Sequence, residues 1–271
     1  MTLLRRHPVV CVVGVLGIAF MWLPILVVVL NSLNGDVYLV QWGGLTLRWF
    51  RQAAADQQVI SAIVTSLEMA LTTAVLSVFV ALTGVLWWRK ASRRGRQFFN
   101  ALVYARLVLP EVVLATSLFL VLTRLELPLG MVTAVIGHTV WDSAFATVIL
   151  QARARLLSEE IEEAGADLGA SPISVLFTVT LPSLAPGILA AGVLAFSLSF
   201  DDVVTSFFLS GSRLTTLPLL VMGFIRFRVT PEVNAIGALV TSSMIASTLF
   251  VLWLVGRSSR GRGSLAQHLG L

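Results

Sequence analysis

Residues 8–30 read PVVCVVGVLGIAFMWLPILVVVL, a run of 23 residues without a charged side chain. A helix needs about 20 apolar residues to cross the hydrocarbon core of a bilayer, so this run predicts a membrane span. It is longer than the apolar core of a signal peptide, and no small-residue cleavage motif follows it. We therefore expect the run to be retained as a transmembrane helix.

The whole chain has the composition of an integral membrane protein. Of its 271 residues, 57% are hydrophobic and 12% are charged, whereas a soluble domain has about 25% charged residues. The apolar content excludes a disordered chain, and a single cysteine, Cys11, excludes a disulfide framework. The formal net charge of +5 would also suit a protein that binds nucleic acid. The positions of the charges along the chain therefore have to show whether nucleic acid is a partner.

Further apolar runs outward from the first one predict an all-α membrane protein with six transmembrane helices. The runs are longer than the alternating strands of about 10 residues that build a membrane barrel. No linker or internal repeat separates them, so we interpret residues 1–271 as a single transmembrane domain. The expected spans after the first are Val59–Trp88, Leu107–Thr123, Leu127–Leu150, Ser183–Ser210 and Val233–Gly256.

Most of the basic residues fall on one side of this membrane plan. Cytoplasmic loops carry an excess of Lys and Arg, so both termini are predicted to be cytoplasmic, and the positive charge needs no nucleic acid. Trp87 and Trp88 suit the aromatic belt at the inner interface, with packing in the core as the alternative. The basic residues on this side are Arg5, Arg6, Arg89, Lys90, Arg93, Arg94, Arg96, Arg153, Arg155, Arg257, Arg260 and Arg262.

Residues 151–182 form the one substantial polar stretch on the cytoplasmic side. Ser158 is placed to cap a helix whose first turn is acidic, and Gly169 is placed to end that helix. Ser171 followed by Pro172 then predicts the start of a second helix.

Ile161, Ala164 and Leu168 recur on one face of the first of these helices. So short a helix between two spans has no core of its own in which to bury an apolar face. It therefore lies on the membrane or docks into a partner, and a solvated acidic surface helix is the alternative.

The same stretch resembles the EAA motif of binding-protein-dependent ABC transporter permeases. That motif reads EAA, three residues, Gly, nine residues, Ile, one residue and Leu-Pro, and its spacing fits throughout. The matching residues are Glu163, Ala164, Gly169, Leu181 and Pro182, with Gly165 in place of the second Ala and Val179 in place of Ile.

The resemblance implies the type I ABC importer permease fold, in a multi-pass protein of the bacterial inner membrane. Residues 151–182 would then hold a coupling helix that fits a groove in an ATP-binding subunit. The implied partners are an ATPase subunit dimer, a second related permease, a periplasmic solute-binding protein and membrane lipid. The implied ATPase-coupling residues are Glu162, Glu163, Ala164, Gly165, Asp167, Gly169, Ala170, Pro172, Leu181 and Pro182.

Other segments resemble the permeases of spermidine/putrescine importers. They include WGGLTLRW at 42–49, SFDD at 199–202 and VTPEVNA at 229–235. Relatives for iron, opines or other amino-acid-like solutes share parts of this pattern. Polyamines are therefore the expected solute, and those other solutes are the alternative.

The motifs that are missing favour a transport subunit over an enzyme. A Walker A loop ends in Gly-Lys-Ser/Thr, but the only lysine, Lys90, follows Arg89. The sequence has no Gly-x-Ser-x-Gly motif and no His/Cys metal spacing. We therefore expect no catalytic residue, metal or cofactor in this chain, with ATP and magnesium bound by a partner chain.

Acidic residues inside the predicted spans point to a pathway for a cationic solute. Ionisable groups at membrane depth cost several kcal/mol and usually face a cavity or a partner. We take Glu68, Asp142, Asp201 and Asp202 as candidate pathway residues. Structural alternatives stay open, with Asp201 and Asp202 capping a broken helix.

Other polar side chains in the spans are expected to be structural. Glu111 is placed to pair with Arg106, and His138 and Cys11 are expected to pack. Two other functions remain as alternatives: a proton-coupled secondary carrier that uses Glu68 or Asp202, and a membrane-embedded enzyme. The enzyme is the more remote, because the sequence has neither a His cluster nor a nucleophile-base pair.

Overall fold

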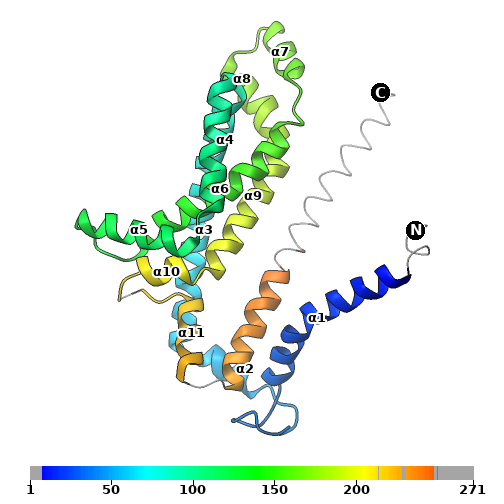
Figure 1. The fold of residues 1–271 in the computed structure, drawn as a ribbon, viewed down its shortest axis with the longest axis vertical. Coiled ribbons are helices and arrows are strands. Elements are labelled where there is room, and N and C mark those ends of the chain that lie inside the picture. The colour runs from blue at the N-terminus through cyan, green and yellow to red at the C-terminus, as the bar shows by residue number, and fades with distance from the viewer. Residues whose placement is uncertain (1–7, 213, 228–229, 247–248, 250–271) are drawn as a thin grey trace. The chain divides into compact units, whose positions relative to one another are not determined.

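The computed structural model describes residues 8–212, 214–227, 230–246 and 249 (Figure 1). In these residues the chain is helical, and the one β-type pairing is an isolated bridge between Asn34 and Leu45. The all-α prediction is confirmed. The helices are α1 (Pro8–Ser32), α2 (Arg48–Ala55), α3 (Gln57–Lys90), α4 (Arg93–Val108), α5 (Glu111–Arg124), α6 (Met131–Ala154), α7 (Glu159–Asp167), α8 (Pro172–Val175), the π-helical turn η1 (Leu176–Thr180), α9 (Leu181–Asp201), α10 (Val204–Leu209), α11 (Leu217–Phe227) and residues 231–246.

Four helices of the described chain are long and apolar enough to cross a membrane. They are Val12–Ser32 within α1, α3, α6 and the continuous run Pro172–Asp201, and α4 with α5 makes a fifth if that bent pair is one span. The sixth predicted span, Val233–Gly256, lies partly outside the described residues. Four or five spans are thus supported, and a sixth stays a prediction.

The predicted span Leu107–Thr123 contains a sharp bend at Pro110. The helix of this region begins at Arg93, and α4 meets α5 at an angle of 102°. Pro110 explains the break, because proline lacks an N–H and disfavours helical geometry in the residue before it. Leu109 is accordingly extended, with φ −64° and ψ 132°.

The chain divides into two compact units, residues 1–61 with 220–245 and residues 62–219 with 246–271. In the first unit, the loop after α1 is ordered by Asn34. Its side-chain oxygen accepts hydrogen bonds from the amides of Asp36 (3.1 Å) and Gly43 (2.8 Å), and its carbonyl accepts one from Trp49 Nε1 (2.7 Å). The single-domain interpretation of the chain stays a prediction.

In the second unit, α3, α4, α6 and α9 lie side by side, and α5 and α10 run across them (Figure 1). Small side chains let helices in a membrane approach closely, and alanines are frequent at these contacts. One core cluster joins α3, α6 and α9, and another joins α3, α5, α6 and α10. Their buried members are Ala81, Val85, Ala146, Leu150, Ala154, Leu184 and Ala191, and Met69, Leu122, Ala134, Val135 and Leu209.

The close contact of α6 with α10 depends on Gly137. A β-carbon at this position would collide with Leu209 Cδ1 and lie 2.8 Å from Thr205 Cγ2. We expect Gly137→Ala to lower the free energy of unfolding by about 1–3 kcal/mol through overpacking, measured by SDS-induced unfolding in detergent. Gly192→Ala is the matched control, because its β-carbon would lie 3.7 Å from its nearest neighbour, Val78 Cγ2. Equal stability of the two variants would contradict this packing.

Candidate functional site

Sequence signals fix both ends of α7 as predicted. The Ser158 side chain accepts a hydrogen bond from an amide of the first turn at 3.2 Å. At the other end Gly169 has φ +84°, and the amides of Gly169 and Ala170 donate to the carbonyls of Ala166 (2.9 Å) and Gly165 (3.1 Å). These two bonds make a Schellman motif, which favours glycine at its left-handed position.

The second predicted helix also begins where expected. Ser171 accepts a hydrogen bond from the amide of Ser174 at 3.2 Å, and Pro172 is in the first turn. The helix then continues through η1 into α9 without a break, as far as Asp201. The second predicted helix and the span that follows it are therefore one continuous helix.

The apolar face predicted for α7 is open. Ile161 is 59% exposed, and Leu168, which directly follows the helix, is 89% exposed. Ala164 on the same face is exposed as well, as are Glu163 and Asp167. An exposed apolar face bordered by carboxylates is suited to docking against another protein.

The opposite face of α7 reaches back to its own unit through Glu162. Arg89 Nη1 and Thr180 Oγ1 both donate to Glu162 Oε1, each at 2.6 Å. Burial tends to raise the pKa of Glu162. The hydrogen bonds from Arg89 and Thr180, with the charges of Arg89 and Lys90, outweigh burial and hold this pKa below its ordinary value, so Glu162 is ionised at neutral pH.

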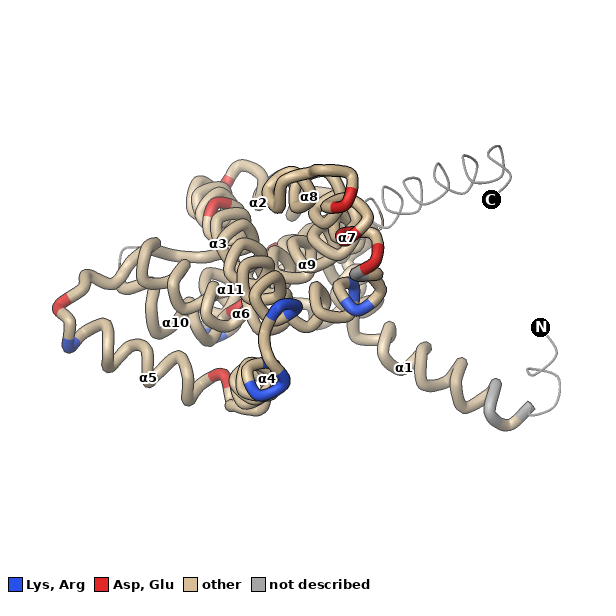
Figure 2. Tube along the Cα trace, turned by 90° about the horizontal axis from the view of Figure 1, so that it is seen from above, with Lys and Arg blue, Asp and Glu red and all other residues tan. Residues whose placement is uncertain are grey.

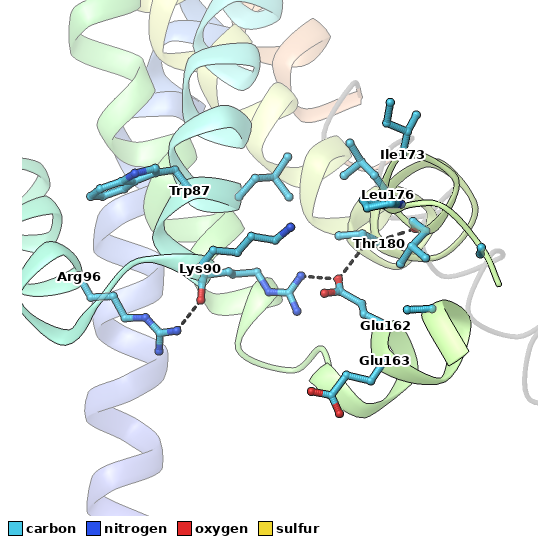
Figure 3. Close-up of a pocket in the computed structure, with 14 residues that line it drawn as sticks. Trp87, Lys90, Arg96, Glu162, Glu163, Ile173, Leu176 and Thr180 are labelled. Atoms are coloured by element: carbon cyan, nitrogen blue, oxygen red, sulfur yellow. Dashed lines mark hydrogen bonds and ion pairs between the residues drawn. The ribbon is translucent and has the colours of Figure 1, made fainter. Parts of the chain in front are cut away.

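A cavity of about 940 Å³ opens beside this cluster. Its walls come from the end of α3, the start of α4, α7 and the α8–η1 turn, and Figure 2 shows the acidic residues of α7 and the basic residues that begin α4. In Figure 3 the Glu162 carboxylate points toward Thr180, whereas the Glu163 carboxylate points away. The two neighbouring acidic side chains therefore point toward different parts of their surroundings.

The structure gathers only part of the predicted coupling set around the cavity. Glu162, Glu163, Ala170 and Pro172 line it. Leu181 and Pro182 are half-buried at the start of α9 and do not. Sequence reasoning missed two members of the cluster, Arg89 and Thr180, because no local spacing relates them to Glu162.

The candidate pathway acids are in different environments. Glu68 and Asp201 are exposed, whereas Asp142 is 1% exposed and the Asp202 side chain is 5% exposed. α9 ends at Asp201 and Asp202 is extended, with φ −71° and ψ 121°, so the separation expected of neighbours in a regular helix does not apply to this pair. Neither carboxylate oxygen of Asp142 has a hydrogen-bond partner in the described chain.

Asp202 has a structural role at the break between α9 and α10. Its Oδ1 accepts a hydrogen bond at 2.8 Å from the amide of Thr205 in the first turn of α10, a contact of the kind that the capping alternative predicts. Thr205 Oγ1 donates to Glu111 Oε1 at 3.3 Å, and His138 Nε2 lies 3.9 Å from Asp202 Oδ2. Glu111 and His138 thus join a buried polar cluster that hydropathy alone did not reveal.

His138 packs in this cluster, as expected. It is fully buried, and its ring nitrogens lie 2.8 Å from Ser199 Oγ and 3.1 Å from Ser206 Oγ. The ion pair expected between Glu111 and Arg106 is absent from the described residues. The environment of the Cys11 side chain lies outside the described part of the chain.

Arg106 is instead held by α6. Its Nε donates to the carbonyl of Val140 at 3.3 Å, and its guanidinium lies 3.6 Å from the ring centroid of Trp141. Such a contact between a guanidinium and an aromatic face is stabilising where water is excluded. The two tryptophans predicted for the inner interface differ in exposure, since Trp87 is 52% exposed and Trp88 is buried.

Comparisons with known proteins agree with this architecture. The family described as "Binding-protein-dependent transport system inner membrane component" matches residues 74–263. The putrescine transport system permease protein PotI of Escherichia coli K12 is 34% identical over 95% of this chain and 94% of its own length. The spermidine/putrescine transport system permease protein PotC of the same strain is 31% identical over 88% and 86%.

A solved structure shows the same fold. A chain of a bacterial ABC transporter involved in the import of the acidic polysaccharide alginate matches with a TM-score of 0.71. The match covers 94% of this chain and 97% of that one. At 14% sequence identity, the likeness is one of fold.

The two adjacent aspartates should differ in their effect on stability. We expect Asp202→Ala to lower the free energy of unfolding by about 1 kcal/mol, because the amide of Thr205 in the first turn of α10 loses its side-chain acceptor. Asp201→Ala is the matched control, and its exposed carboxylate makes no hydrogen bond in the described chain. SDS-induced unfolding in detergent measures both, and an equal loss in the two variants would contradict the capping role.

Proposed function

This chain belongs to the family of binding-protein-dependent transport system inner membrane components, and we propose that it is a permease subunit of an ATP-driven importer for polyamines such as putrescine or spermidine. The family makes it a transport subunit and not an enzyme. The likeness to a putrescine permease along nearly the whole of both chains is the observation that carries the solute class.

The open face of α7 supports the coupling role within this proposal. The residues that fit into the groove of a partner ATPase are the exposed ones, Ile161, Glu163, Ala164 and Leu168. ATP and magnesium bind to the ATPase subunit dimer. Closing of that dimer moves α7, and the spans follow as rigid bodies to give alternating access.

The remaining partners and the topology belong to the same proposal. A second, related permease completes the pathway, and a periplasmic binding protein delivers the solute to the outer loops. The type I plan of six spans places both termini in the cytoplasm of a bacterial cell, with lipid around the helices.

Carboxylates suit the transport of a polyamine, which carries several ammonium groups at neutral pH. Glu68 and Asp201 are exposed on the surface of this chain, where a pathway shared with a second permease would reach them. Asp142 and Asp202 are buried, so they line the pathway only if the helices packed around them move apart. Glu68 and Asp201 are therefore the first pathway residues to test.

The coupling proposal predicts loss of the ATPase when the motif is changed. We expect Glu163→Ala and Gly169→Ala to reduce the ATPase that co-purifies with the complex by about tenfold. The second change strains a backbone with φ +84°, which glycine adopts without cost. Glu160→Gln, at an exposed acid of α7 outside the motif, is the control.

Two outcomes of this experiment would contradict the coupling proposal. One is full retention of the ATPase by both variants. The other is uptake of solute by the purified chain alone in liposomes under a proton gradient, which would favour a secondary carrier.

The solute proposal predicts that neutral side chains at the exposed acids weaken transport. In the reconstituted complex, we expect Glu68→Gln and Asp201→Asn each to lower uptake of labelled putrescine by about tenfold, because a cation loses its counter-charge. Glu126→Gln, at an exposed acid outside the predicted pathway, is the matched control. Unchanged uptake in both test variants would remove these residues from the pathway.

A further inference from the structure

α7 is attached to its own chain through a small surface. Among residues 160–167, only Glu162 and Gly165 are partly buried. Gly165 has no side chain and lets α7 approach α8 closely, since a β-carbon there would lie 3.4 Å from Val175 Cγ2. In this stretch, Glu162 is the one side chain with a described hydrogen bond to another helix.

Both hydrogen bonds of Glu162 end on the same oxygen atom. Arg89, the donor at 2.6 Å, is the penultimate residue of α3, and Thr180, the other donor at 2.6 Å, is the last residue of η1. One carboxylate thus ties α7 to two helices that continue into two membrane spans. Hydrogen bonds to an ionised group are the stronger class, and these two are short.

The α3 side of this cluster is held in place by Arg96 from α4. Arg96 Nε donates to the carbonyls of Trp88 and Ala91, both at 3.1 Å, and Arg96 Nη2 donates to the carbonyl of Arg89. Two of these acceptors, Trp88 and Arg89, are among the last carbonyls of α3, which lack partners within a helix. The backbone from which Arg89 projects is therefore fixed.

The α9 side is shaped by the π-helical turn. An α-helix turns about 100° per residue, so the one extra residue of a π turn rotates the chain that follows it, and such turns are frequent at functional sites. Thr180 Oγ1 lies 3.5 Å from the carbonyl of Val175, five residues earlier. The turn leaves the Thr180 hydroxyl facing Glu162 (Figure 3).

The ion pair is also sheltered from water. The Arg89 side chain is 10% exposed and the Glu162 side chain is 21% exposed. Exposed ion pairs contribute little because solvent and salt screen them. A largely covered pair whose carboxylate accepts a second hydrogen bond, from Thr180, is better suited to transmit a displacement.

We propose that Arg89, Glu162 and Thr180 form the joint through which movement of α7 is transmitted to α3 and α9. When the ATPase displaces α7, the shared carboxylate pulls the inner ends of both helices with it. The three side chains are positioning residues, since they contact neither ATP nor solute. This inference rests on the proposed function, because it needs an ATPase docked on the open face of α7.

The test measures putrescine uptake and ATP hydrolysis in the same proteoliposomes, with the full complex of ATPase, both permeases and binding protein. We expect Glu162→Gln and Arg89→Met each to lower the putrescine imported per ATP hydrolysed by about fivefold. The amount of co-purified ATPase should stay within twofold of the unchanged complex. Thr180→Val, which keeps the side-chain shape and removes the donor, should lower the ratio by about twofold.

An exchange of charges separates a joint from a merely stabilising contact. Arg89→Glu and Glu162→Arg should each uncouple hydrolysis from uptake, and the double variant should restore the ratio to within twofold of the unchanged complex. Glu160→Gln, on the same helix but without a partner on another element in the described chain, is the control and should leave the ratio unaltered.

Three results would overturn the proposal that these residues form a joint. They are an unaltered ratio in both Glu162→Gln and Arg89→Met, loss of the ATPase from the Glu162→Gln complex, and no recovery in the double exchange when it is as stable as the unchanged complex. Failure of the proposed function is distinguishable from all three. It would appear in the unchanged complex, as absence of a bound ATPase or of ATP-driven putrescine uptake.

Discussion

The lack of water in the bilayer core constrains everything else in this chain. Backbone N–H and C=O groups at membrane depth must find partners inside the protein, so the long apolar runs in the described part of the chain are helical. Each interruption then needs its own solution. After α9 ends, the partner is a side chain, because Asp202 accepts a hydrogen bond from the amide of Thr205 in the first turn of α10. At Pro110 one donor is simply missing, and the helix changes direction by 102°.

Local signals were enough to predict the helices between residues 151 and 182. Ser158, Gly169 and Ser171 act within a few residues of their own positions, and each does in the structure what its type favours. The apolar runs likewise predicted most span positions, because length and hydropathy are properties of a continuous segment. The direction of a helix is not such a property, so hydropathy did not give the angle of 102° between α4 and α5.

Contacts between distant segments were beyond prediction from one sequence. Glu162 is 73 residues from Arg89 and 18 from Thr180, and no periodicity connects such positions. The same holds for Glu111 and Thr205, which are 94 residues apart. Sequence reasoning recognised the acids as unusual but could not separate exposed ones, such as Glu68, from Asp142, which is buried. That distinction depends on which helix face meets a neighbour.

Lys90 has a practical consequence for the study of this protein. It is the only lysine in the chain, and it lines the cavity next to α7. A reagent selective for primary amines can therefore attach a fluorophore to one side chain only, apart from the terminal amine. The natural sequence thus carries a built-in attachment point for an optical reporter beside the helix expected to meet the ATPase.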